Sequence, residues 1–392
     1  MDHNAYRHAL GAQMAQSELP FAPEEFAARL HRTRAAMEGA GLDALLLTDP
    51  ADIFYLTGYH TFEVSVHTAL VVSGDRLVLQ VPSIETGPAV VTALVDEIIG
   101  YLWEDIDAVI DPLADTLAPY RAIGLDLYAA SLRHGVIRAL QARLGEARFR
   151  DDGGTLMDGL RLVKTEAELD CLRESARITS AGLCAAEALV CAGTTDNAIA
   201  AEGARALLAE GSEFMSLQPI VTTGRRIGTI HVNHKRHVIG HDEPVFLEFG
   251  AAFHRYTAPM MRTAVAGRPS DEMRRIADLC RTLFDTLRAE MRPGRSFDDA
   301  ARAAEAVLAP HAETIFFSGV FGYSVGAQFP PSWVEGTGYI ARGQSRGFES
   351  GMVFHLPLCL RVPGQWGIGL SDTVLVTGAG AVPITENTWR LG

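Results

Sequence analysis

The order of strand-like and helix-like segments changes partway along the chain, and this change constrains the fold more than any other feature. Up to about residue 144, short apolar runs alternate with amphipathic segments, a pattern typical of an α/β domain. A polar, glycine-containing run at 151–154 interrupts this pattern. One long helical segment and then mostly strand-like segments follow, which indicates an α+β arrangement. Because 392 residues exceed what one ordinary core holds, we expect two domains, residues 1–155 and 156–392.

Local signals predict individual elements within each domain. In the second domain, Thr165 followed by Glu168 forms the pattern of a capping box, which predicts that a long helix begins there. This helix should run to about residue 191. The other expected elements are a helix over 23–41, strands over 44–48 and 53–56, a hairpin over 68–81, and helices over 271–291 and 298–308.

Charge and apolar content exclude several classes of protein. The formal net charge is −14 and only two lysines occur, so we expect no nucleic-acid partner, because phosphate binding relies on clustered basic side chains. No uncharged apolar stretch approaches the roughly 20 residues that span a bilayer, and the first residues carry no pattern of a secretion signal. We therefore expect no membrane association and a cytoplasmic location.

One carboxylate stands out in an apolar strand-like run. Glu248 lies among Val245, Phe246, Leu247 and Phe249, and a charged group is costly to bury there without a partner. Either Glu248 serves a function, or it is paired with a basic residue such as Arg262. Its sequence position alone leaves both interpretations open.

The segment around this carboxylate resembles the core hairpin of the pita-bread superfamily, which includes creatinase, prolidase and aminopeptidase P. The resemblance extends over residues 246–263, where the superfamily places two aspartates, eleven residues apart, that hold a dinuclear metal centre. Glu248 and Pro259 occupy those positions here. The resemblance implies a pita-bread C-terminal domain preceded by a smaller, creatinase-type α/β N-terminal domain.

The other metal-binding positions of the superfamily are also changed. Its histidine falls on Tyr323, its first glutamate on Pro357 and its last glutamate on Ser371. Metal ions need carboxylate, imidazole or thiolate donors, and of the five positions only Glu248 keeps one. We therefore expect no metal and no other cofactor, and an activity other than that of a metallopeptidase.

Within the superfamily, the sequence is most similar to the metal-free branch, and to ectoine hydrolase in particular. The similar segments are 255–263, 322–333, 351–355 and 366–373. The loop at 60–67 departs from the ectoine hydrolase pattern, and in creatinase-like dimers this loop reaches into the partner's active site. The resemblance thus implies a homodimer whose sites are completed by the partner's N-terminal domain. The candidate substrate-selecting residues of that loop are His60, Glu63 and His67.

Hydrolysis without a metal limits the kind of substrate. A metal lowers the pKa of bound water from about 15.7 to about 7, so a site without one needs an electron-poor substrate such as a cationic amidine or guanidine. Glu248 can then act as nucleophile, or as the anchor and base. His231 lies 17 residues before Glu248, the separation at which creatinase and aminopeptidase P carry a histidine that handles protons. His234, nearby, is an alternative for that role.

Tyr323 is the third catalytic candidate: it either forms a hydrogen bond with the reacting nitrogen or oxygen or is a packed aromatic residue. The remaining candidates would bind the substrate. His355 either faces the same site or is a hydrogen-bonded core residue. Asp372 is a candidate partner for the ring nitrogen of a cation, and the planar side chains of Tyr256 and Trp366 can stack on one. Arg262 is either a further substrate-binding residue or a buried partner for a carboxylate.

These features predict a metal-independent hydrolase that opens a C–N bond of a small cyclic amidine such as ectoine, giving an N-acetyl-diaminobutyrate. Two alternatives remain open. One is a creatinase-like amidinohydrolase acting on a guanidino acid, and the other is a pita-bread scaffold that binds without turnover. The expected partner is a small-molecule substrate, a cationic amidine or guanidine.

Overall fold

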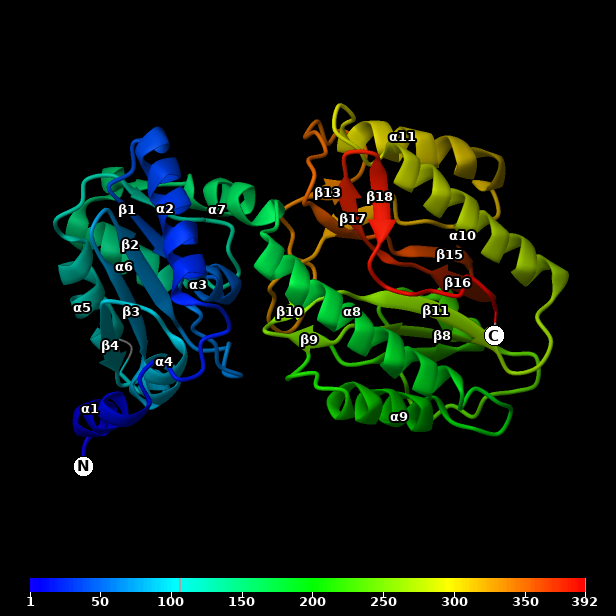
Figure 1. Cartoon of the computed structure of the whole chain (residues 1–392), viewed down its shortest axis with the longest axis horizontal. Helices are drawn as coiled ribbons and strands as arrows, with labels where there is room; N and C mark the ends of the chain where they lie inside the picture. Colours follow the sequence, from blue (N-terminus) through cyan, green and yellow to red (C-terminus); the bar gives the residue numbers. More distant parts are fainter. Residues whose placement is uncertain (106, 392) are drawn as a thin grey trace. The chain divides into compact units, whose positions relative to one another are not determined.

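The chain folds into two compact units, Met1–Arg161 and Leu162–Gly392. The computed structural model describes all residues except 106 and 392. The boundary expected after residue 155 falls inside helix α7 (Gly153–Leu162). The mixed α+β class and the two-domain organisation are confirmed, and each unit is described separately below (Figure 1).

The first unit is built on one six-stranded sheet. Its strand order is β4-β3-β2-β1-β5-β6, with β1 antiparallel to β2 and parallel to β5. Strands β2 and β3 form the predicted hairpin. The strands are β1 (Ala44–Leu47), β2 (Ala69–Ser73), β3 (Leu77–Pro82), β4 (Glu97–Tyr101), β5 (Ile123–Gly124) and β6 (Phe149–Arg150).

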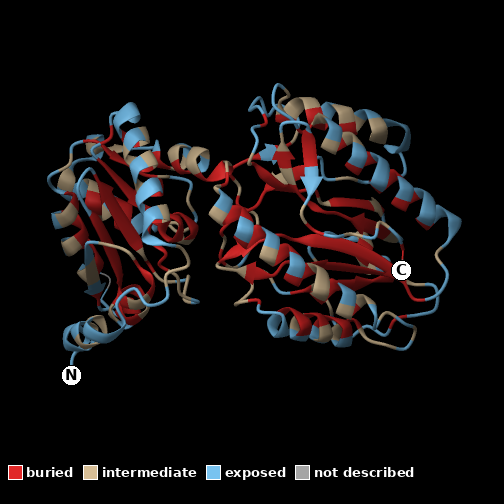
Figure 2. Cartoon of the chain, in the orientation of Figure 1, coloured by how far each residue is buried: buried red, intermediate tan, exposed pale blue. Residues whose placement is uncertain are grey.

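Helices cover this sheet, and separate apolar clusters fill the space on its two faces. The central strands are buried along their whole length (Figure 2), as expected when both faces are covered. The helices are α1 (His3–Met14), α2 (Pro23–Ala40), α3 (Pro50–Thr57), α4 (Thr86–Thr92), α5 (Asp107–Leu117) and α6 (His134–Leu144).

The strand predicted over residues 53–56 is wrong, because these residues belong to helix α3. The side chain of Asp49 accepts hydrogen bonds from the backbone N–H groups of Ala51 and Asp52, and Pro50 occupies the first turn, an arrangement that starts a helix. The helix is buried on all sides, so its apolar residues form an unbroken run. Such a run does not by itself distinguish a buried helix from a buried strand.

The second unit begins with helix α8 (Glu166–Glu187), whose capping box between Thr165 and Glu168 forms as predicted. Helices α8 and α9 (Asp196–Ala209) pack on one face of a three-stranded antiparallel sheet of order β11-β8-β7. Its strands are β7 (Ile220–Thr223), β8 (Pro244–Phe249) and β11 (Met260–Val265). Strands β9 (Ala252–Phe253) and β10 (Tyr256–Thr257) form a small separate pair.

A second layer of strands and helices completes this unit. A five-stranded sheet has the order β13-β12-β14-β17-β18, and β15 pairs with β16 as a hairpin. Helices α10 (Asp271–Glu290) and α11 (Phe297–Leu308) pack against these strands in the largest apolar cluster (Figure 1). The strands are β12 (Gly322–Ser324), β13 (Tyr339–Ile340), β14 (Val353–His355), β15 (Leu358–Val362), β16 (Trp366–Leu370), β17 (Thr373–Thr377) and β18 (Gly380–Pro383).

Strand β8 is the central strand of the three-stranded sheet, with one face toward α8 and α9 and the other toward the second layer, and it is buried throughout. Alternate side chains of a strand point to opposite faces. Val245, Leu247 and Phe249 join the cluster formed with α8 and α9, whereas Phe246 packs with Cys359 of β15 on the other face. Glu248 therefore points toward the second layer, away from the helices.

Among the described residues, no helix has the length and apolar character needed to cross a membrane.

Candidate active site

A pocket of about 320 Å³ lies on the Glu248 face of β8. Strands β7, β8, β11, β12 and β15 and the turn around residues 227–232 contribute to its walls. Apolar side chains dominate the lining: Ile220, Ile227, Ile230, Val232, Phe246, Met261, Val320 and Pro357. Its volume and apolar character are typical of a site for a small ligand.

Glu248 is the carboxylate of this pocket. Ile220 of β7 and Met261 of β11 are its direct cross-strand neighbours, so both flank it on the same face of the sheet. The carboxyl group forms no hydrogen bond or ion pair with the residues that the structure describes, and its pairing with Arg262 does not occur. Burial raises the pKa of Glu248 to about 8, although the positive charge of Arg361 opposes this shift. The apolar surroundings therefore favour a protonated carboxyl group at neutral pH.

Arg361 and Cys359 lie on β15 and line the same pocket. Arg361 donates from Nη1 to the backbone oxygen of Cys359 at 3.3 Å, and its buried Nε has no hydrogen-bond partner among the described residues. Burial raises the pKa of the Cys359 thiol to about 11, so this group is not a thiolate at neutral pH. The pocket thus places one guanidinium and one carboxyl group in an apolar setting, without a direct contact between them.

Tyr323 also lines the pocket, and a chain of hydrogen bonds runs from it into the protein. Its hydroxyl oxygen lies 2.9 Å from Nε1 of Trp333 and 2.7 Å from Nδ1 of His355. The other ring nitrogen of His355 lies 2.6 Å from Oγ of Ser371. Strand register explains the contact between Tyr323 and His355, because they are paired residues on β12 and β14. His355 is fully buried, and burial lowers its pKa to about 3.

His231 is the histidine that reaches this pocket. It is exposed and sits in a turn with φ of 57°, a left-handed conformation that is uncommon for residues other than glycine. The ring of His234 contacts the side-chain oxygen of Asn233 at 2.9 Å through Nδ1, and His234 does not line the pocket. Of the two candidate proton carriers, His231 is the one placed beside Glu248.

Four other predicted site residues in the second unit lie outside the pocket. Arg262 forms an ion pair with Glu187 at 2.8 Å, and the hydroxyl group of Tyr256 donates to Glu168 at 2.9 Å. Trp366 starts β16 without lining the pocket.

The fourth of these residues, Asp372, is held by side chains of the C-terminal segment. It accepts hydrogen bonds from Thr385 at 2.7 Å and from Trp389 at 2.9 Å. Burial raises the pKa of Asp372 to about 7, although these hydrogen bonds oppose the shift. Its surroundings are therefore those of a carboxyl group built into the protein rather than one open to a ligand.

The three candidates of the first unit differ from one another in setting. His60 is half-buried, with Nδ1 3.0 Å from the backbone oxygen of Gly58. Hydrogen bonds from Ser65 hold the pKa of the half-buried Glu63 below its usual value. His67 is buried, and burial lowers its pKa to about 4, so it is a neutral core residue of its unit.

Comparison with known proteins decides the family. The sequence profile of metallopeptidase family M24 matches residues 170–378, and that of the creatinase/prolidase N-terminal domain matches residues 29–163. The chain belongs to metallopeptidase family M24. This membership agrees with the pita-bread fold expected from the hairpin around Glu248.

The M24 proteins that are similar to this chain are named after different activities. Ectoine hydrolase of Halomonas elongata is 25% identical over 399 residues, covering 95% of this chain and 98% of that protein. An Xaa-Pro dipeptidase of Pyrococcus furiosus is 20% identical over 363 residues, covering 93% and 99%. The crystal structure of the prolidase from Pyrococcus horikoshii superposes with a TM-score of 0.81 at 19% identity, covering 93% of this chain and 99% of that one. The comparisons thus show a hydrolase family, and they leave open which kind of bond this chain cleaves.

The residues at the family's metal positions do not fit a pair of metal ions. Glu248 is the one carboxylate, Tyr323 supplies a phenol, and Pro259 and Pro357 supply no side-chain donor. Ser371 is already engaged with His355 and with the backbone N–H of Met261. No group of three or more histidine, cysteine, aspartate or glutamate side chains that could hold a metal ion occurs in the part of the chain that the structure describes. We therefore derive no catalytic step through a metal.

Sequence reasoning missed two titratable residues of the pocket, Arg361 and Cys359. The signal for Arg361 was present, because it is a charged residue in the apolar run Leu358–Val362. The argument that singled out Glu248 on β8 applies to it equally. Trp333 was also not considered as a partner of Tyr323, since their contact depends on a loop conformation that local sequence does not specify.

Proposed function

We propose that this M24 protein is a metal-independent hydrolase that opens a C–N bond of a small cationic amidine, with ectoine as the leading candidate substrate. The observation that carries the proposal is the unpaired Glu248 carboxyl group in an apolar pocket. An amidinium cation would supply the missing positive partner, and its electron-poor carbon would lie beside the carboxylate.

The raised pKa of Glu248 supports a cationic ligand. A carboxyl group with a pKa of about 8 is mostly protonated at pH 7, and binding of a cation favours its ionised form. Substrate binding would then release the proton and generate the carboxylate in place. His231, on the rim of the pocket, would accept and return protons as the nitrogen departs.

Two routes for Glu248 are consistent with this arrangement. As a base, it takes a proton from water, whose oxygen bonds the amidine carbon before the C–N bond breaks and the nitrogen leaves with a proton. As a nucleophile, its oxygen bonds that carbon first, and water then releases the adduct. Both routes consume one water per substrate and give an N-acetyl diamino acid from ectoine.

The direct test is incubation of the purified protein with ectoine and with creatine, followed by mass spectrometry of the products. We expect N-acetyl-diaminobutyrate from ectoine, at the same rate with and without a chelator. Glu248→Gln should lower this rate by about 10³-fold or more, whereas the same chemical change at the exposed helix residue Glu272 should leave it unchanged.

The other outcomes identify which alternative holds. Urea from creatine would replace the proposal with an amidinohydrolase. Cleavage of Xaa-Pro dipeptides that requires added metal would overturn it in favour of a peptidase. Ligand binding that is indifferent to Glu248→Gln, without any product, would indicate a scaffold.

Calorimetry tests the charge argument separately from turnover. Binding measured in buffers of different ionisation enthalpy should report release of about 0.9 proton per ligand at pH 7, since that fraction of a group with a pKa of about 8 is protonated. The released fraction should fall toward zero by pH 9. Proton release that does not change with pH would contradict a role for Glu248 as the cation's partner.

We further propose that the protein is a homodimer in which residues of the 60–67 loop complete the partner's site. Mixing inactive variants tests this. If a Glu248→Gln chain and an inactive Glu63→Ala chain form mixed dimers, one of the two sites in each is intact, and about a quarter of full activity should return. No recovery in a sample shown to exchange subunits would contradict shared sites.

A further inference from the structure

The chain of hydrogen bonds behind Tyr323 determines which way its hydroxyl hydrogen points. Four side chains take part, in the order Trp333, Tyr323, His355, Ser371. Two of them, Tyr323 and Ser371, occupy positions where the family resemblance places metal ligands. Because each group can donate or accept only a fixed number of hydrogen bonds, the direction of every bond follows from its neighbours.

The count begins at Ser371, the inner end of the chain. Its Oγ accepts a hydrogen bond from the backbone N–H of Met261 at 2.7 Å. The one acceptor within reach of its own hydroxyl hydrogen, among the described residues, is Nε2 of His355 at 2.6 Å. If Nε2 carried a hydrogen instead, Ser371 would accept two bonds and its own hydrogen would be buried without a partner, which is unfavourable. Ser371 therefore donates to Nε2.

This direction fixes the tautomer of His355. The ring is fully buried and neutral, because burial lowers its pKa to about 3, so it carries a single N–H. With Nε2 accepting from Ser371, the hydrogen lies on Nδ1 and is donated to the hydroxyl oxygen of Tyr323 at 2.7 Å.

The oxygen of Tyr323 is then saturated as an acceptor. It receives one hydrogen bond from Nδ1 of His355 and a second from Nε1 of Trp333, which can only donate. Its own hydrogen finds no acceptor among its hydrogen-bonded neighbours, and Tyr323 lines the pocket. Burial also raises the pKa of Tyr323 well above its ordinary value, so the hydroxyl group keeps this hydrogen.

We propose that Tyr323 is a fixed hydrogen-bond donor to the reacting oxygen of the substrate, and that Trp333, His355 and Ser371 are positioning residues that aim it. The identity of that oxygen rests on the proposed function. An amidinium ion presents only N–H donors, which match the carboxylate of Glu248 and cannot accept from Tyr323. An acceptor arises only when an oxygen bonds the amidine carbon. The hydrogen bond therefore forms as the reaction proceeds, which stabilises the transition state selectively.

The tautomer is measurable without any substrate. Nitrogen-15 spectra of the full chain, labelled at histidine, should contain one of 13 histidines that is protonated at Nδ1 and accepts at Nε2. It should keep these neutral-ring shifts down to about pH 4, since burial lowers the pKa of His355 to about 3. Loss of the signal in His355→Gln assigns it, and its perturbation in Tyr323→Phe assigns it independently. If the signal assigned to His355 is that of a neutral ring protonated at Nε2, the inference is overturned.

Kinetics tests the same inference through the reaction. Tyr323→Phe should lower kcat by about 10²–10³-fold with KM nearly unchanged, because the hydrogen bond is absent from the bound ground state. Ser371→Ala, which releases the constraint on the tautomer, should lower kcat less, and Ser371→Thr should restore it by keeping a hydroxyl group. A rise in KM with unchanged kcat in Tyr323→Phe would overturn the proposed role. If neither an amidine nor a guanidine is turned over, the proposed function is wrong. The tautomer of His355 then still shows which way the hydroxyl hydrogen of Tyr323 points.

Discussion

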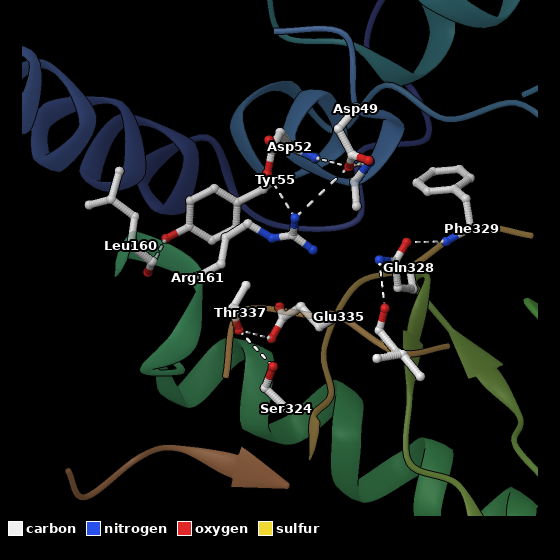
Figure 3. Close-up of polar contacts among 12 residues, drawn as sticks. Asp49, Asp52, Tyr55, Leu160, Arg161, Ser324, Gln328, Phe329, Glu335 and Thr337 are labelled. Carbon is white, nitrogen blue, oxygen red and sulfur yellow. Dashed lines mark hydrogen bonds and ion pairs between the residues drawn. The ribbon is translucent and has the colours of Figure 1, made fainter. Parts of the chain in front are cut away.

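Two buried glutamates of the second unit have opposite surroundings. The side chain of Glu335 is 2% exposed and forms an ion pair with the fully buried Lys164 at 2.6 Å. It also accepts a hydrogen bond from Thr337, which in turn contacts Ser324 (Figure 3). Glu248 is similarly buried, since the whole residue is 9% exposed and Glu335 is 8% exposed. Its carboxyl group nevertheless has no such partners among the described residues, and burial raises its pKa to about 8.

This difference in partners distinguishes a buried carboxylate with a structural role from one with a functional role. A buried charge that is paired and hydrogen-bonded can be retained because its local contacts offset its desolvation. A buried carboxyl group without partners lowers stability when it ionises, so it is expected mainly where a ligand supplies the partner. Burial alone is therefore no sign of function, whereas burial without compensation in a pocket is.

Removing one partner of the compensated pair should produce the largest loss of stability. Glu335→Gln removes the carboxylate that pairs with the buried Lys164 ammonium, and we expect the free energy of unfolding to fall by about 3–5 kcal/mol. Chemical denaturation at pH 7 measures this loss. The double variant Lys164→Met/Glu335→Leu removes both charges and should lose much less. Equal losses in the single and double variants would show that the packing, rather than the charge pairing, matters.

The same substitution at Glu248, to glutamine, should increase the free energy of unfolding. Because the folded-state pKa of about 8 exceeds the unfolded value of about 4.3, the folded state binds the proton more tightly. Stability is then highest below about pH 4.3 and falls as the pH rises to about 8. Glu248→Gln cannot ionise, so at pH 8 it should be more stable than the natural protein by roughly 4–5 kcal/mol, with little difference near pH 4.5.

Unfolding curves of both proteins across pH 4–9 measure this difference. Asp52 and Asp372 also have pKa values raised to about 7 by burial, but they are present in both proteins and cancel in the comparison. A constant difference between the two proteins over this range would contradict the raised pKa of Glu248.

Sequence alone located one side of this contrast, Glu248, for reasons that are visible in particular residues. Glu248 stood out because β8 is otherwise apolar, and the start of α8 was predicted from Thr165 and Glu168 because a capping box is local in sequence. The family resemblance named Tyr323 as a replaced ligand position. These signals involve either neighbouring residues or a family motif, and they do not depend on knowing how distant strands pair.

What the sequence did not reveal depends on tertiary contacts. The bonds of His355 link β12 to the residue after β16, and strand pairing across such separations has no local signal. Tyr256 and Arg262 carry side chains suited to a binding site, yet each reaches a carboxylate of α8 instead. Residue type therefore predicted candidates, and the pairing of strands and helices decided which of them reach the pocket.

The smallest expected effect concerns Arg361, the charge that opposes the raised pKa of Glu248. Arg361→Met removes this positive charge, so the pKa of Glu248 should rise further, by about 0.5–1 pH unit. The acidic limb of kcat/KM, which reports ionisation in the free protein, should move to higher pH by the same amount. Arg361→Lys keeps the charge and should leave the limb in place, although it changes hydrogen bonding. If both variants moved the limb equally, the influence of Arg361 on Glu248 would arise from the geometry of the pocket rather than from charge.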